Sequence, residues 1–173
     1  MEEALQLAII RAKEWQSAQS LQPQTQSTTQ LTRQINQTSS TSLSGKCLSD
    51  ASWKIGGLAG IGWIFKDSQD VTLQEGSAPI SFAGSPLIAE AMATLAAVGV
   101  ALESDYKNLF FASDSMILVK VLNLKIQQKE LHGILHDILH LSLNFNVCSF
   151  NFISRSLNHQ ADLLAKTALL SPL

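Results

Sequence analysis

The sequence predicts one α/β domain in which helices flank a mixed β-sheet. A chain of 173 residues with 46% hydrophobic side chains can bury one core but is too short for two full domains. From residue 47 onward the hydrophobic pattern switches between strand and helix spacing in the order βββαβααβα. Strands that are reached through helices should run parallel to a neighbour, which makes the sheet mixed.

The segment before the domain has a different composition. Residues 1–19 carry apolar side chains at helical spacing and predict a short helix, either a remnant of a longer parent protein or a partner-binding element. Its apolar positions are Leu5, Ile9, Ala12 and Trp15. Residues 20–46 consist mostly of Gln, Ser and Thr and predict a disordered linker. The folded domain is therefore expected over residues 47–173.

Three short β-type runs open the folded part, at residues 47–53, 60–65 and 71–79. The residues between them, Gly56-Gly57 and the polar stretch 66–70, favour turns. The simplest arrangement is an antiparallel meander.

A long helix follows, with Ser85 as its N-cap and Pro86 as its first residue. Its many alanines make it slim enough to approach a sheet closely. The pattern then predicts a buried strand, two helices, a last strand and a last helix. These cover residues 108–112, 115–122, 131–143, 146–153 and 158–170.

Composition and charge argue against several classes of protein. The net charge of −2, from 12 basic and 14 acidic residues, provides no overall basicity to hold nucleic acid. The N-terminus lacks the order of a secretory signal, and the longest apolar stretch, residues 91–102, falls short of the roughly 20 residues that cross a bilayer. The distant Cys47 and Cys148 suit buried thiols in a reducing, intracellular compartment, nuclear or cytoplasmic.

Four acidic residues are the candidate site. Asp50 lies inside a predicted strand, where an unpaired charge would be costly, and Asp114 directly follows another strand. Glu90 interrupts the alanine-rich helix, and Asp162 lies in the first turn of the last helix. Taken singly, Asp114 could be a helix cap, Asp162 a partner of the helix dipole, and Glu90 a solvent-exposed residue.

Taken together, the four carboxylates would repel one another unless cations held them. Two Mg²⁺ ions would neutralise them, with Mn²⁺ as an alternative ion, because hard cations prefer oxygen ligands. Such a site is typical of phosphodiester hydrolysis.

Six stretches in this order make residues 47–170 resemble the ribonuclease H-like domain, in the version found in plant retroelement-derived, reverse-transcriptase-associated proteins. The stretches are LSDASW (48–53), AGIGWIF (59–65), SPLIAEA (85–91), SDS (113–115), FISR (152–155) and NHQADLLAK (158–166). The resemblance implies a five-stranded mixed sheet, three antiparallel strands followed by two parallel ones, with helices on both faces. It also implies endonucleolytic cleavage of the RNA strand of an RNA–DNA hybrid.

The resemblance further assigns roles to residues. Asp50 would bridge two Mg²⁺ ions, Glu90 and Asp114 would share one of them, and Asp162 would hold the other. Arg155 stands nearest the place where some members use a His, and it is expected to face phosphate. Small polar residues beside the acids are the other candidate contacts to the substrate: Ser52, Ser115 and Asn158.

Two alternatives to a hybrid-cutting endonuclease stay open. Between Asn123 and Glu130 the chain offers only Lys125 and Lys129 to grip a duplex. The protein could therefore be a catalytically weak or inactive nucleic-acid-binding relic of a retroelement polyprotein. A two-metal exonuclease is a third option. In each case the expected partner is nucleic acid, the chain is expected to be a monomer, and no membrane is involved.

Two other patterns predict structure and not chemistry. His132, His136 and His140 recur every four residues, but the apolar stripe of their helix faces another way, so the three should face water. Trp53 and Trp63 lie in strand patterns and should be packing residues.

Overall fold

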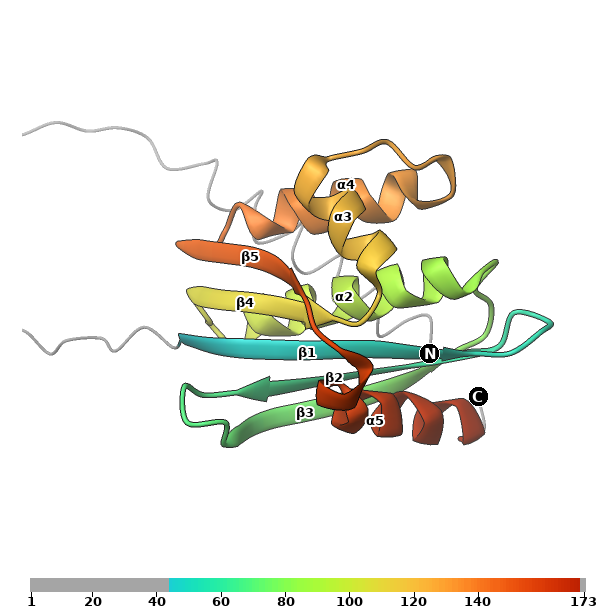
Figure 1. Cartoon of the computed structure of the whole chain (residues 1–173), viewed down its shortest axis with the longest axis horizontal. Helices are drawn as coiled ribbons and strands as arrows, with labels where there is room; N and C mark the ends of the chain where they lie inside the picture. The colour runs from blue at the N-terminus through green and yellow to red at the C-terminus, as the bar shows by residue number, and fades with distance from the viewer. Residues whose placement is uncertain (1–43, 172–173) are drawn as a thin grey trace, which may run out of the picture.

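The computed structural model describes residues 44–171 and shows one five-stranded sheet in the order β3-β2-β1-β4-β5 (Figure 1). The strands are β1 (Ser44–Trp53), β2 (Ala59–Lys66), β3 (Thr72–Ile80), β4 (Asn108–Ser113) and β5 (Val147–Phe152). The helices are α2 (Pro86–Glu103), α3 (Met116–Leu124), α4 (His132–Ser142) and α5 (His159–Leu170), with short 3₁₀ turns at Lys129–Leu131 and Arg155–Leu157. The predicted helix over residues 1–19 lies outside the described residues, as does most of the predicted linker.

The sheet has the predicted mixture of directions. β1, β2 and β3 pair antiparallel, whereas β4 pairs parallel with β1 and β5 parallel with β4. All nine predicted strands and helices of the domain are present, and their ends differ from the predicted ones by a few residues. The predicted fold class is therefore confirmed.

The largest difference is at the start of the domain, where β1 begins at Ser44 and not at Cys47. Its first residues pair with β4, Ser44 with Asn108 and Gly45 with Leu109. They had been assigned to the linker by composition, but strand pairing uses backbone groups and does not require apolar side chains. Gly45 is needed there, because a Cβ at this position would lie within 2.2 Å of the Lys66 carbonyl oxygen.

Helices cover both faces of the sheet, as expected. α2, α3 and α4 enclose the larger core on one face, and α5 lies on the other face over β1, β2 and β3 (Figure 1). By length and composition alone α2 could cross a membrane, but more than half of it is buried inside the fold, which explains its apolar sequence.

Glycines bring α5 unusually close to the sheet. Gly60 and Gly62 of β2 face the helix, and a Cβ on Gly62 would lie 2.7 Å from the backbone of Ala161 and Ala165. This contact sets the position of the first turn of α5, which carries Asp162, relative to the neighbouring strand β1.

Candidate metal centre

Three of the predicted acids meet where two parallel strands separate. The last β1–β4 pair is Leu48 with Ala112, so Asp50 and Asp114 both lie two residues beyond it. β1 lies between antiparallel β2 and parallel β4, and such switch points are the usual ligand sites of open α/β sheets. Oxygen atoms of Asp50, Glu90 and Asp114 lie within 4.8 Å of one another.

A buried pair of hydroxyls fixes the helix that carries Glu90. Ser49 Oγ in β1 and Thr94 Oγ1 in α2 lie 3.2 Å apart, and both side chains are buried. Glu90 is one helical turn before Thr94, so this contact fixes the part of α2 that carries Glu90 against β1. Asp50 follows Ser49 in the strand and points to the other face, and its oxygen atoms still come within 4.8 Å of those of Glu90. Neither hydroxyl was among the predicted site residues; their signal was a polar residue inside an apolar strand and helix.

The environment of Asp50 and Glu90 disfavours negative charge. Asp50 is only 3% exposed, and Asp50 Oδ2 and Glu90 Oε2 are buried without a hydrogen-bond partner. Burial, reinforced by the neighbouring carboxylate of Asp114, raises the pKa of Asp50 to about 7. Burial and the charge of Asp50 raise the pKa of Glu90 to about 9. The alternative of Glu90 as a solvent-exposed residue was therefore wrong.

These features fit a hard divalent cation. The donor set consists of carboxylate oxygens alone, which suits Mg²⁺ or Mn²⁺ and not zinc. A cation would satisfy the two unpartnered oxygens and offset the burial and the repulsion that raise both pKa values. Asp50, Glu90 and Asp114 are the residues that would hold it.

Asp162 stands apart from this group. Its Oδ2 accepts a 2.7 Å bond from Lys166 Nζ, one turn later on α5, and it is not part of the 4.8 Å cluster. It remains close enough for its charge to contribute to the raised pKa of Asp50. Of the four acids expected to converge, the structure brings three together and leaves Asp162 beside them, held by its own helix.

Asn158 has a different place from the one predicted. Its side chain is fully buried, and Nδ2 donates to the Ser49 carbonyl at 3.0 Å and to Asp114 Oδ1 at 3.4 Å. It cannot touch a duplex at the surface, and its side chain does not cap α5. The predicted substrate contact is replaced by a positioning role: Asn158 ties Asp114 to the β1 backbone beside Asp50.

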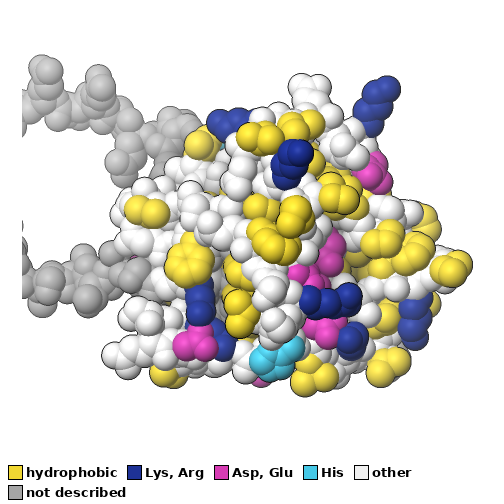
Figure 2. Space-filling model, in the orientation of Figure 1, with side chains coloured by type: hydrophobic (Ala, Val, Ile, Leu, Met, Phe, Trp, Pro, Cys, Tyr) yellow, Lys and Arg dark blue, Asp and Glu magenta, His cyan; other side chains and the backbone are white. Residues whose placement is uncertain are grey.

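The other predicted substrate contacts lie around the acids. Arg155 is 78% exposed, and its Nε lies 3.9 Å from Asp114 Oδ2. Ser115 is half-buried, and its hydroxyl accepts a hydrogen bond from the Leu118 N–H, which makes Ser115 the N-cap of α3. Asp114, which could have been a helix cap, does not have this role. Ser52 is half-buried in β1, two residues beyond Asp50. Figure 2 shows acidic side chains reaching the surface beside a Lys or Arg side chain.

The residues set aside as structural behave accordingly. His132, His136 and His140 are exposed on α4, whose buried face is formed by Leu135, Ile138 and Leu141. Trp53 donates from Nε1 to the Ala83 carbonyl at 2.8 Å, and Trp63 packs against the core.

Comparisons with known proteins agree with this geometry. Residues 48–168 match the model of the reverse transcriptase-like family. None of the curated proteins matches the sequence. RNase H1 from the archaeon Halobacterium salinarum is similar in structure, with a TM-score of 0.69 at 24% identity over 72% of this chain and 96% of its own.

Two further solved structures have the same fold. LC11-RNase H1, isolated from compost and solved in complex with an RNA/DNA hybrid, gives a TM-score of 0.64 at 24% identity, covering 72% of this chain and 95% of its own. The RNase H domain of prototype foamy virus gives 0.61 at 16% identity, covering 73% and 94%. The chain belongs to the reverse transcriptase-like family, and its described residues form a ribonuclease H-like domain of retroelement type.

Proposed function

We propose that this protein is a divalent-metal-dependent endonuclease that cleaves the RNA strand of RNA–DNA hybrids. The observation that carries the proposal is the cluster of Asp50, Glu90 and Asp114, with two buried carboxylate oxygens that lack a partner. A similar fold, LC11-RNase H1, was solved with an RNA/DNA hybrid bound, which supports the choice of substrate.

The chain's own residues have separable roles in this reaction. Asp50, Glu90 and Asp114 would hold Mg²⁺, or Mn²⁺ in its place, and Asn158 keeps the Asp114 carboxylate oriented. A bound divalent cation supplies the activation of water and the stabilisation of charge on the scissile phosphate. Arg155, exposed beside Asp114, would contact a phosphate of the duplex.

The number of ions that the site would bind, one or two, depends on whether the Asp162 carboxylate is available. A second ion would need the Asp162 carboxylate, which Lys166 holds. Replacing that lysine, Lys166→Gln, frees Asp162 and should tighten binding of a second ion if the site takes two. Isothermal titration with Mn²⁺ measures the number of ions bound by the wild type and by this variant.

Cleavage of an internally labelled hybrid tests the proposal. Purified protein with Mg²⁺ should yield internal fragments of the RNA strand, and Asp50→Asn should remove the activity. Glu103→Gln, an exposed acid at the end of the same helix as Glu90, is the matched control and should cleave normally. Cleavage that persists in Asp50→Asn would point to a contaminating nuclease. Wild-type protein freed of that contaminant that leaves the hybrid intact would refute the assignment, and digestion from an end would indicate an exonuclease.

A nucleic-acid-binding module with little turnover is the second candidate. The pairing of Asp162 with Lys166 favours it, because the fourth acid is then withheld from the metal centre. Hybrid binding without cleavage, in Mg²⁺ and in Mn²⁺, would support this candidate. A monomeric state and an intracellular location are further parts of the proposal, to be tested by sedimentation and by imaging of a tagged chain.

A further inference from the structure

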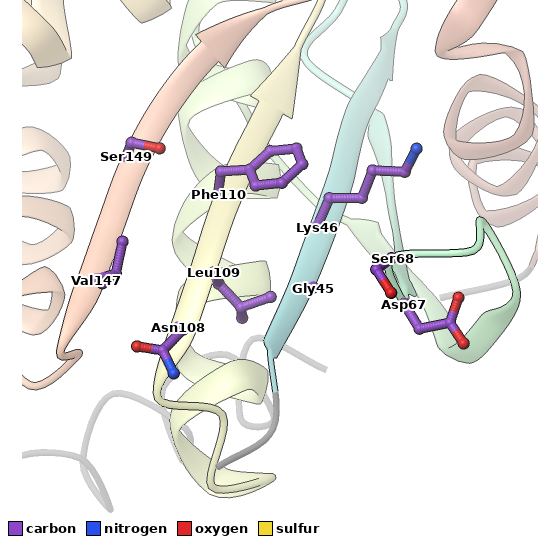
Figure 3. Close-up of a pocket in the computed structure, with 9 residues that line it drawn as sticks. All are labelled: Gly45, Lys46, Asp67, Ser68, Asn108, Leu109, Phe110, Val147 and Ser149. Atoms are coloured by element: carbon purple, nitrogen blue, oxygen red, sulfur yellow. The ribbon is translucent and has the colours of Figure 1, made fainter. Parts of the chain in front are cut away.

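One face of the parallel part of the sheet lacks a covering layer. β1, β4 and β5 run parallel, and parallel strands are normally covered on both faces. α5 packs on β1, β2 and β3, and within residues 44–171 no helix lies over the same face of β4 and β5. Apolar side chains are exposed there, among them Phe110 on β4 and Val147 on β5 (Figure 3). Exposed apolar side chains on a face that parallel strands normally bury indicate a contact surface.

This face, which we call the open face, contains a groove. A hollow of about 470 Å³ lies over the first residues of β1, β4 and β5, where Phe110 projects from β4 toward Lys46 (Figure 3). A second hollow of about 300 Å³ runs on beneath the connection between β5 and α5. Lys46 and Phe110 line both hollows, so the two hollows adjoin, and together we call them the groove of the open face.

The polar rim of the groove is already neutralised in part. Lys46 and the buried Lys66 both bind Asp70, and Asp67 and Ser68 lie at the edge of the first hollow. The basic and acidic side chains at this rim nearly cancel, so its net charge is small. Such a rim disfavours binding of a polyanion and favours binding of an amphipathic segment that carries both kinds of charge.

We propose that residues 1–19 of this chain dock in the groove of the open face as an amphipathic helix. The described part of the chain begins at Ser44, and the next two residues, Gly45 and Lys46, line the first hollow. The preceding chain therefore enters the fold at the groove itself. The residues between Trp15 and Ser44 are long enough to reach any point of this face, because a chain advances up to about 3 Å per residue.

The pattern of the segment matches the groove. Leu5, Ile9, Ala12 and Trp15 would form one apolar stripe, and a helix of this length is marginal in water without a partner surface. Because the segment belongs to the same chain as the groove, weaker apolar contacts suffice to hold it than a separate peptide would need. Docking would complete the second layer over β4 and β5.

Photo-crosslinking in the full chain tests the proposal. A benzophenone-bearing phenylalanine analogue in place of Phe110, 42% exposed, should crosslink within one molecule to peptides from residues 1–19. The same analogue in place of Phe82, 68% exposed in the loop before α2, is the matched control and should give about tenfold less of this product. Ile9→Asp, which places a charge in the apolar stripe, should reduce the crosslink from position 110 to the control level.

Two other outcomes of the crosslinking experiment would overturn the docking proposal. Crosslinks between two copies, seen as a dimer band that weakens on dilution, would make the open face a self-association surface. The experiment is repeated with the analogue in place of the exposed Val147. If neither position 110 nor position 147 crosslinks to residues 1–19 more strongly than position 82 does, the segment does not occupy the groove. The readout does not depend on cleavage, so its failure would leave the proposed nuclease activity intact.

Discussion

The repulsion among the three clustered acids predicts an unusual gain of stability on removal of one of them. In metal-free protein, Glu90→Gln should be more stable than the wild type at pH 8. The pKa of Glu90 rises from 4.5 to about 9 on folding, because the side chain is buried beside Asp50 and Asp114. Between these values the folded chain keeps a proton that the unfolded chain loses, so the wild type becomes less stable as the pH rises.

The magnitude follows from the same interval. Each pH unit above 4.5 lowers the free energy of unfolding of the wild type by about 1.4 kcal/mol, so the loss of stability at pH 8 has an upper limit of about 5 kcal/mol. Relaxation and water entry reduce such penalties, and we expect Glu90→Gln to gain about 2 to 3 kcal/mol at pH 8 and less than about 1 kcal/mol at pH 5. Glutamine is neutral at both pH values and similar in shape, so the packing of α2 should not change.

Urea denaturation followed by circular dichroism, in EDTA at pH 5 and pH 8, measures this difference. Glu103→Gln, exposed on the same helix, should show no comparable gain. Added Mg²⁺ should reverse the order, because the wild type binds the ion in its folded state more tightly than the variant. A Glu90→Gln protein that is less stable than the wild type in EDTA at pH 8, or equally affected at both pH values, would refute the reasoning.

Three further outcomes test other parts of the structure. Gly62→Ala should cost about 2 kcal/mol or more in urea denaturation, because its Cβ would meet the backbone of α5 at 2.7 Å; Gly133→Ala, which meets nothing within 4 Å, should cost nothing. Asn158→Ala should cost about 2 kcal/mol and weaken Mn²⁺ binding in calorimetry, because the Asp114 carboxylate loses the amide that orients it. Burial raises the pKa of Cys148 to about 11, so iodoacetamide should label it slowly at pH 8 unless urea is added; rapid labelling of the native chain would contradict its placement.

The sequence predicted the architecture because local patterns decide it. Alternating apolar residues, the Ser85-Pro86 start of α2 and the apolar stripe of α4 specify each element without reference to the others. The same patterns limited the pairing of the strands to a mixed sheet. Composition failed at Ser44–Lys46, where backbone pairing outweighs polar side chains.

The site could be predicted only in part. Asp50 was conspicuous as a charge inside a strand, and the other three acids by their places in or directly after apolar elements. The resemblance to a known family added only the role of each acid. No sequence pattern shows that Ser49 meets Thr94, or that the Asn158 amide reaches Asp114, because these contacts join elements distant in the chain.

The amino-acid sequence by itself determined which residues form strands and helices and which four acids were candidates, since both depend on residue type and spacing. Only the tertiary structure decided that three of these acids share one buried cluster while Lys166 keeps Asp162 beside it. The physical reason is that carboxylate separation depends on how closely helices approach the sheet. Here Gly62 under α5 and the Ser49–Thr94 contact under α2 set that distance.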